Sequence, residues 1–229
     1  MTSKTERSGL EAPRNPQRRH VTGRWLAMGG AAGLAAAASA TWAGREAAAQ
    51  AARGPAGSKL PDLPLVTQDG KTVRFYSDLV RGKVVFINMM YAQCSVQCPP
   101  TTQNLKRAYE ALGARAGKDI FMYSISLTPE ADSPAALRAY MKQQGVGPNW
   151  TFLTGRPEDV DRIRRGLGFA DPDPKLDGDL TRHTGMVRVG NDALDRWTMT
   201  PSMVSPGQIL ECLMAVDPVT RASGRIHVA

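Results

Sequence analysis

The sequence predicts an α/β fold in which a central mixed sheet carries helices on both faces and an extra β-hairpin at its N-terminal end. Three observations lead to this prediction. Short apolar runs alternate with segments of helical period from residue 84 onward. The turn dipeptide Asp69-Gly70 interrupts a β-forming stretch at residues 65–73, and Gly190-Asn191-Asp192 separates two further short runs. We therefore expect one hairpin before the alternating region and one near its end.

The predicted elements follow in a regular order. The expected strands cover residues 65–73 as a hairpin, 84–87, 120–127, 150–153, 186–189 and 196–199, and the expected helices cover about 101–116, 133–145, 157–167 and 206–215. Ser133-Pro134 is a typical helix start, because serine caps free backbone N–H groups and proline fits the first turn. The order hairpin, β, α, β, α, β, α, β, β, α is that of a thioredoxin-like domain.

Composition favours one domain and argues against a nucleic-acid-binding protein. The chain has 229 residues, 42% of them hydrophobic, which is enough for a real core. Its net charge is +8, but residues 1–49 hold seven basic and three acidic residues and so account for +4 of it. In the rest of the chain acids and bases alternate, and aromatic residues make up 6% of the sequence. We therefore expect no nucleic-acid partner.

Residues 1–49 have the layout of an export signal or an N-terminal membrane anchor. A basic beginning that ends in Arg18-Arg19 precedes a weakly hydrophobic Ala/Gly segment with small-residue cleavage sites. The paired arginines favour the twin-arginine route. Residues 25–43 are nearly long enough to span a bilayer, which takes about 20 residues. In either case we expect an exported, periplasmic domain, whose contact with the membrane is through this segment if it is uncleaved.

Three further parts follow this N-terminal segment. Residues 50–59 are rich in Ala and Gly and are expected to form a linker. Residues 60–216 are expected to form the thioredoxin-like domain. Residues 217–229 are polar, and we expect a flexible tail there.

Cys94 and Cys98 are the candidate reactive residues. They emerge from a turn after the apolar run at residues 84–87 and are followed by two prolines. If a helix begins near Cys94, the i, i+4 spacing places both sulfurs on one face, and the helix N-terminus lowers the thiol pKa. The pair could then bind a soft metal ion or form a disulfide. The alternative is two buried cysteines that act as small apolar residues, but their position at the end of a strand argues against burial.

His183 is the third candidate ligand. It follows a loop at residues 171–180 that is rich in Pro, Gly and Asp. Two thiolates and one imidazole suit copper, whereas a structural zinc site would need a fourth ligand. The strand that begins near Met186 should lie beside the strand at residues 84–87 and bring this loop toward the cysteines. The alternative for His183 is a solvated side chain without a ligand.

Three parts of the sequence together resemble the Sco/SenC family: the run Tyr91 to Pro99 with its CxxxCP motif, the segment Ser124 to Pro134, and the downstream His183. The resemblance implies a thioredoxin-like fold with copper held by Cys94, Cys98 and His183. It also implies a metallochaperone that assembles the copper centre of a respiratory oxidase. The expected partners are a copper-receiving oxidase subunit or a copper donor protein.

Two positions depart from the family pattern. The family usually has an aspartate before the proline of the second segment and another before the histidine, where this chain has Thr128 and Arg182. A carboxylate beside a copper ligand normally orients it or balances charge. The loss of both should weaken Cu(II) binding most, so Cu(I) is the expected cargo.

The alternative function is a periplasmic thiol-disulfide oxidoreductase that cycles Cys94 and Cys98 between dithiol and disulfide.

Met89 and Met90 are candidate auxiliary soft contacts for the metal. Cys212 is expected to be a buried helix residue, with a role in mixed disulfides as the alternative. We expect no role for the histidines at either end of the chain.

Overall fold

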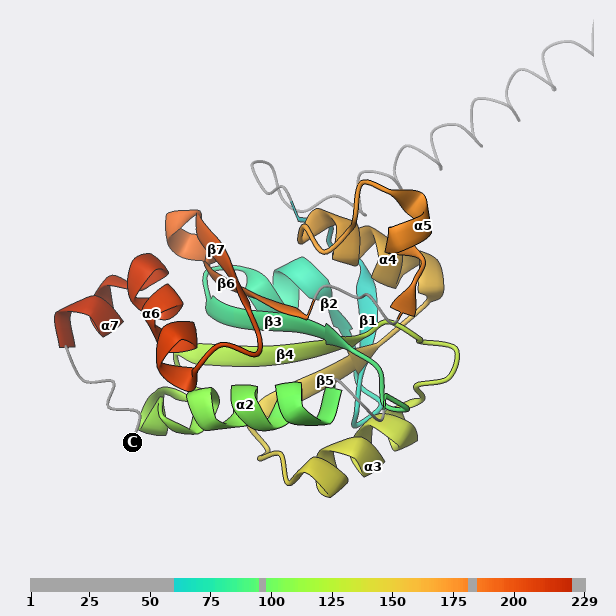
Figure 1. Ribbon diagram of the computed structural model, residues 1–229, viewed down its shortest axis with the longest axis horizontal. Helices are drawn as coiled ribbons and strands as arrows, with labels where there is room; N and C mark the ends of the chain where they lie inside the picture. The colour runs from blue at the N-terminus through green and yellow to red at the C-terminus, as the bar shows by residue number, and fades with distance from the viewer. Residues whose placement is uncertain (1–59, 95–97, 181–184, 224–229) are drawn as a thin grey trace, which may run out of the picture. The chain divides into compact units, whose positions relative to one another are not determined.

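Within residues 60–94, 98–180 and 185–223, which the computed structural model describes, a seven-stranded mixed sheet forms the centre of the domain (Figure 1). Its strands are β1 (Pro64–Thr67), β2 (Thr72–Arg74), β3 (Val84–Met90), β4 (Ile120–Ser126), β5 (Trp150–Thr154), β6 (Met186–Asn191) and β7 (Arg196–Pro201). They pair in the order β2-β1-β5-β4-β3-β6-β7.

Strand β3 lies between β4 and β6 and is parallel to one of them and antiparallel to the other. It runs parallel to β4, which in turn runs parallel to β5. It runs antiparallel to β6, with Asn88 opposite Val187. The hairpin β1–β2 joins the sheet through antiparallel pairing of β1 with β5. The predicted N-terminal hairpin and the predicted position of the late strand beside the strand of residues 84–87 are both confirmed.

Helices cover both faces of the sheet, as predicted (Figure 1). The helices α2 (Cys98–Glu110), α3 (Pro134–Gln144) and α6 (Pro206–Val216) pack on one face, where Phe86 of β3 joins their apolar side chains. The helix α4 (Pro157–Gly166) packs on the other face against Val85 and Ile87. Neighbouring residues of β3 therefore belong to different cores, because side chains alternate across a strand.

Helix α2 begins earlier and ends earlier than the sequence predicts. It starts at Cys98, so that Pro99 and Pro100 occupy the first turn, where their missing N–H groups are not needed. It ends at Glu110, and a short 3₁₀ turn, Gly113–Arg115, follows. Gly113 has a φ of 56°, which glycine adopts readily and which does not continue a helix.

Short helical segments occur at several positions where the sequence predicts none. Phe75–Val80 forms a single π-helical turn before β3. Pro174–Asp177 forms the one-turn helix α5 inside the expected surface loop. Asp173 caps α5 by accepting a hydrogen bond from the Lys175 backbone N–H at 2.9 Å.

The expected flexible tail is wrong for its first part, because Pro218–Ser223 forms helix α7. Asp217, just before this helix, is buried and accepts hydrogen bonds from the Arg115 guanidinium at 2.7 Å and from the Thr220 hydroxyl at 2.6 Å. Burial alone would raise the pKa of Asp217, but the bonds from Thr220 and Arg115 outweigh it and lower the pKa. A long-range ion pair, which polar composition does not reveal, orders this segment.

We predict that Asp217→Ala lowers the free energy of unfolding by about 1–3 kcal/mol, because it leaves buried hydrogen-bond donors without an acceptor. Urea unfolding measures this change. Because the pKa of Asp217 is lowered in the folded state, the contribution is present above its unfolded pKa of about 3.9 and is lost as the pH falls further.

The matched control is Asp119→Ala, which removes the other carboxylate that pairs with Arg115. Asp119 has a side-chain exposure of 48%, so the expected loss is below about 1 kcal/mol. Equal losses of stability in the two variants would contradict the stabilising role of the ion pair between Asp217 and Arg115.

Candidate metal centre

The two cysteines of the sequence motif meet at the junction between β3 and α2. After β3 the chain turns, and the Cys94 N–H donates to the Tyr91 carbonyl at 3.2 Å. Helix α2 then begins at Cys98, whose backbone N–H donates to the Cys94 sulfur at 3.2 Å. Cys94 thus serves as an acceptor for the first N–H group of the helix, which otherwise has no partner within the helix.

Both cysteines are buried, contrary to the sequence-based expectation. Cys94 is 7% exposed and Cys98 is 3% exposed. Their side chains join the apolar cluster beneath α2, together with Met90 of β3 and Leu105 of α2. The end of a strand is here covered by the helix that follows it, so the position of the pair in the sequence did not predict its burial.

Burial raises the pKa of the Cys98 thiol to about 12. A hydrogen bond with the Tyr91 backbone opposes this shift, whereas the neighbouring Cys94 side chain and the charge of Asp132 add to it. The expected lowering of the thiol pKa is therefore wrong for Cys98. Its thiol remains protonated at neutral pH, and a metal ion that binds the sulfur must displace the proton.

Tyr91 lies beside the pair at the beginning of the same turn. A side-chain hydrogen bond with Cys94, together with burial, raises the pKa of its phenol to about 12. The phenol is therefore neutral at physiological pH and keeps its hydrogen-bonding proton. This contact was not part of the sequence-based site.

Asp132 is a further residue of the site that the sequence-based list omits. Its Oδ2 accepts hydrogen bonds from the Ala92 backbone N–H at 3.1 Å, the Ser126 hydroxyl at 2.6 Å and the Thr128 hydroxyl at 3.2 Å. The carboxylate thus links the turn that carries Cys94 to the end of β4. The sequence signal for Asp132 is its place in the segment Ser124 to Pro134, four residues after Thr128.

His183 and Arg182 lie outside the residues that the structure describes, so the proposed three-ligand set stays a prediction. In the described ranges, no group of three or more His, Cys, Asp or Glu side chains is arranged to hold a metal ion. The described chain resumes at Gly185, whose carbonyl accepts hydrogen bonds from the Ser202 N–H at 2.7 Å and its hydroxyl at 2.5 Å. The Ser202 hydroxyl lies 3.5 Å from the hydroxyl of Thr101 in the first turns of α2.

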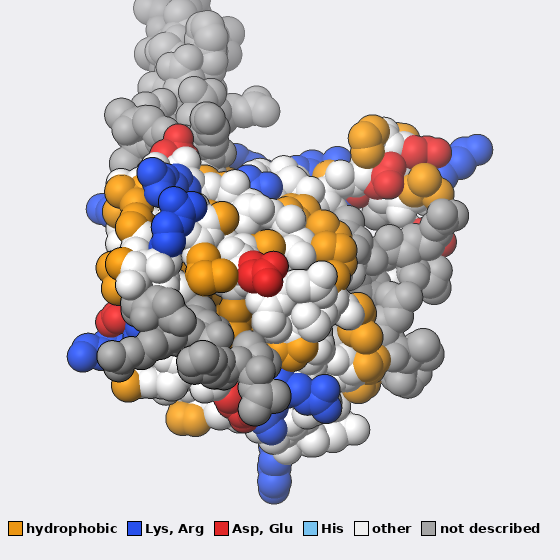
Figure 2. All heavy atoms as spheres, turned by 60° about the vertical axis from the view of Figure 1, so that its left-hand side comes forward, with side chains coloured by type: hydrophobic (Ala, Val, Ile, Leu, Met, Phe, Trp, Pro, Cys, Tyr) orange, Lys and Arg blue, Asp and Glu red, His pale blue; other side chains and the backbone are white. Residues whose placement is uncertain are grey.

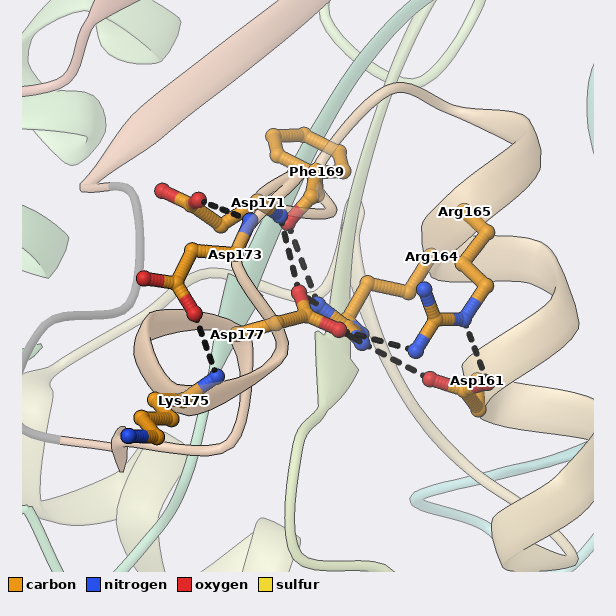
Figure 3. Close-up of polar contacts among 8 residues, drawn as sticks. All are labelled: Asp161, Arg164, Arg165, Phe169, Asp171, Asp173, Lys175 and Asp177. Atoms are coloured by element: carbon orange, nitrogen blue, oxygen red, sulfur yellow. Dashed lines mark hydrogen bonds and ion pairs between the residues drawn. The ribbon is translucent and has the colours of Figure 1, made fainter.

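The loop at residues 171–180, which precedes His183 in the sequence, is held in place by a cluster of charged residues (Figure 3). Asp177 of α5 accepts hydrogen bonds from Arg164 and Arg165 of α4 and from the Asp171 backbone N–H. The bond from Arg164 is the main cause that holds the pKa of Asp177 far below its usual range, and burial opposes it. Asp161 completes the cluster by accepting from both arginines. These ion pairs fix the loop at residues 171–180 to α4.

A cavity of about 220 Å³ lies beside this charged cluster, on the sheet face opposite the cysteines. Met89 lines it together with Leu127 and Phe169 and belongs to the core cluster beneath α4. Met90 instead packs with Cys94 and Cys98. Of the two candidate thioethers, Met90 alone shares the core cluster of the cysteines.

Cys212 of α6 is half-buried at the edge of the same core as the cysteine pair.

Figure 2 brings the side with α6 and α7 forward and shows Lys and Arg side chains in separate groups with apolar side chains between them. On the described part of this face, no continuous basic patch of the kind that binds a nucleic-acid backbone is visible.

Several curated relatives of this chain carry Sco names. The SCO1 protein homolog of Bacillus subtilis is 29% identical over 107 residues, which cover 46% of this chain and 54% of that protein. The SCO2-like protein of Rickettsia conorii is 28% identical over 99 residues, which cover 43% of this chain and 46% of that protein. The chain thus spans about half the length of these two relatives.

Solved structures of similar fold include Bradyrhizobium japonicum ScoI with copper bound, at 24% identity and a TM-score of 0.53 over 67% of this chain and 96% of that one. Yeast Sco1 with copper bound is 18% identical, with a TM-score of 0.52 over 69% of this chain and 97% of that one. The SCO1/SenC family model matches residues 54–216. Since this match covers well over half of the chain and includes the whole cysteine motif, the protein belongs to the SCO1/SenC family.

Proposed function

We propose that this protein is a copper-binding metallochaperone that delivers copper to, or matures the copper centre of, a respiratory oxidase. The observation that carries the proposal is the contact between the Cys98 N–H and the Cys94 sulfur, which holds the two residues together at the start of α2. Two sulfurs in an apolar setting are a soft donor set that suits Cu(I). Family membership and the copper-bound Sco structures support the same conclusion.

His183 is the proposed third ligand. It precedes Gly185 by two residues, and two Cα–Cα steps span at most about 7.6 Å. Gly185 is itself bonded to Ser202, beside Thr101 in the first turns of α2. These contacts support a position for the imidazole within reach of the cysteines.

A thiol-disulfide oxidoreductase that uses Cys94 and Cys98 is the alternative, and the burial of the pair speaks against it. Thiol exchange needs a thiolate that a partner can reach. Both cysteines are less than a tenth exposed, and the pKa of Cys98 is raised to about 12. A metal ion displaces the thiol proton when it binds, so copper binding does not require a preformed thiolate at Cys98.

The proposed location is the periplasm. Residues 1–49 would act as the export signal, or residues 25–43 would anchor the domain to the inner membrane if they are not cleaved. Among the described residues, none of the helices has the length and hydrophobicity that crossing a bilayer requires. The proposed partners are the copper-receiving oxidase subunit and a copper donor protein, and Cu(I) is the proposed cargo.

We predict that the reduced protein retains about one Cu(I) per chain in competition with a coloured Cu(I) chelator such as bicinchoninate. Cys94→Ala and Cys98→Ala should lose this copper, because each removes one of two thiolate ligands. His183→Ala should lower the Cu(I) affinity at least about tenfold.

Cys212→Ala and His227→Ala are the matched controls, since they remove the same donor types outside the proposed site, and both should bind like the wild type. Failure of the wild-type protein to retain copper would refute the metallochaperone. A wild-type affinity in His183→Ala would remove His183 from the ligand set.

We also predict that iodoacetamide alkylates Cys98 at least about a hundredfold more slowly in the folded, copper-free protein than in the urea-unfolded chain at pH 7.5. The reason is that both burial and a thiol pKa of about 12 lower the amount of reactive thiolate. Peptide mass spectrometry measures the rate, which should keep rising with pH above about 9. Similar rates in the folded and unfolded states would favour the oxidoreductase.

A further inference from the structure

Asp132 is completely buried, yet only one of its two carboxylate oxygens accepts hydrogen bonds from the part of the chain that the structure describes. Its Oδ2 accepts three hydrogen bonds, from Ala92, Ser126 and Thr128. Its Oδ1 has no hydrogen-bond partner among the residues that the structure describes. An unpaired oxygen of a buried carboxylate is costly, so its presence calls for a functional explanation.

Asp132 also differs from the other buried carboxylates of the described chain, each of which pairs with an arginine. Asp62 binds Arg74, Asp159 binds Arg156 and Asp217 binds Arg115. None of the ion pairs formed within the described ranges includes Asp132. A buried negative charge is ordinarily balanced by a cation, and no protein cation in the described ranges balances this one.

The charge of Asp132 acts on the cysteine pair. Asp132 accepts a hydrogen bond from the backbone N–H of Ala92, two residues before Cys94. Its charge also contributes to the raised pKa of the Cys98 thiol. Thr128, which stands where the family pattern has an aspartate, donates its hydroxyl to Asp132 at 3.2 Å. Asp132 thus supplies a carboxylate close to the position at which the family pattern would place one.

The charge of Asp132 acts differently on the two oxidation states of copper. Two thiolates and Cu(I) carry a net charge of −1, which a nearby carboxylate repels, whereas two thiolates and Cu(II) are neutral. The field of one carboxylate therefore favours the Cu(II) form over the Cu(I) form.

We infer that Asp132 is a positioning and charge-setting residue of the copper site, which holds the Cys94 turn in place and keeps the Cu(II) form accessible beside the Cu(I) form. This inference rests on the proposed copper-binding function. It assigns Asp132 a role that compensates for the absence of a carboxylate at Thr128.

Two substitutions of Asp132 separate position from charge. Asp132→Asn keeps an oxygen that can accept the bonds from Ala92 and the two hydroxyls, but it removes the charge. It should raise the ratio of Cu(I) to Cu(II) affinity at least about tenfold, which corresponds to a rise of about 59 mV in the reduction potential of the bound copper. Asp132→Ala should in addition remove the hydrogen-exchange protection of the Ala92 amide in the copper-free protein.

Thr128→Lys provides a second route in case Asp132 variants fold poorly. It brings an ammonium group near the carboxylate while Asp132 and its other hydrogen bonds remain, so it should shift the affinity ratio in the same direction. Asp62→Asn is the matched control: it neutralises a buried, multiply bonded carboxylate that pairs with Arg74, and it should leave the ratio unchanged.

The outcomes distinguish this inference from the function on which it rests. If the wild type binds Cu(I) but no Cu(II), or if Asp132→Asn and Thr128→Lys leave the ratio within about twofold of the wild type, the inference is overturned and the metallochaperone stands. If the wild type retains neither ion, the proposed function itself fails.

Discussion

Strand β3 is hydrogen-bonded along both edges, and the candidate metal centre depends on this constraint. Its parallel pairing with β4 brings the end of β4, and with it Asp132, close to the turn that carries Cys94. Its antiparallel pairing with β6 brings the start of β6 to the same end of the strand. Segments from three distant parts of the sequence thus converge where β3 ends.

Alternation along β3 then decides which side chains enter the site. Met89 and Met90 are adjacent in sequence, but they point into different cores, and Met90 packs with the cysteines. The same alternation separates the cysteine pair from the cavity beside α4 and α5. The charged cluster of Asp177 and Arg164 therefore holds a loop in place on the opposite face of the sheet and takes no direct part in holding the sulfurs.

Desolvation sets the protonation of Cys98, one member of the cysteine pair. An exposed thiol at a helix N-terminus tends to ionise, whereas a thiol in an apolar core tends to stay protonated. At Cys98 the second effect is larger, and the charge of Asp132 adds to it. A site of this kind exchanges protons for a metal cation more readily than it attacks a disulfide, which is consistent with copper transfer.

Much of the architecture followed from local sequence patterns. The alternation of apolar runs with helical periods predicted the sheet with helices on both faces, and the Asp69-Gly70 dipeptide predicted the first hairpin, because hydrophobic period and turn chemistry are local properties. The spacing of Cys94 and Cys98 and their place after a strand likewise predicted that the two residues lie together. In contrast, the prolines after Cys98 did not reveal where α2 begins.

The sequence by itself thus determined the order of the elements, the fold class and the identity of the paired cysteines, since all three depend on residues that are neighbours in the chain. Tertiary structure alone decided the burial of the pair, the hydrogen bond from the Ala92 N–H to Asp132 across 40 residues, and the ion pair of Arg115 with Asp217 that orders α7. Burial and long-range pairing depend on which surfaces meet when the chain packs, and no local pattern of residue types records that.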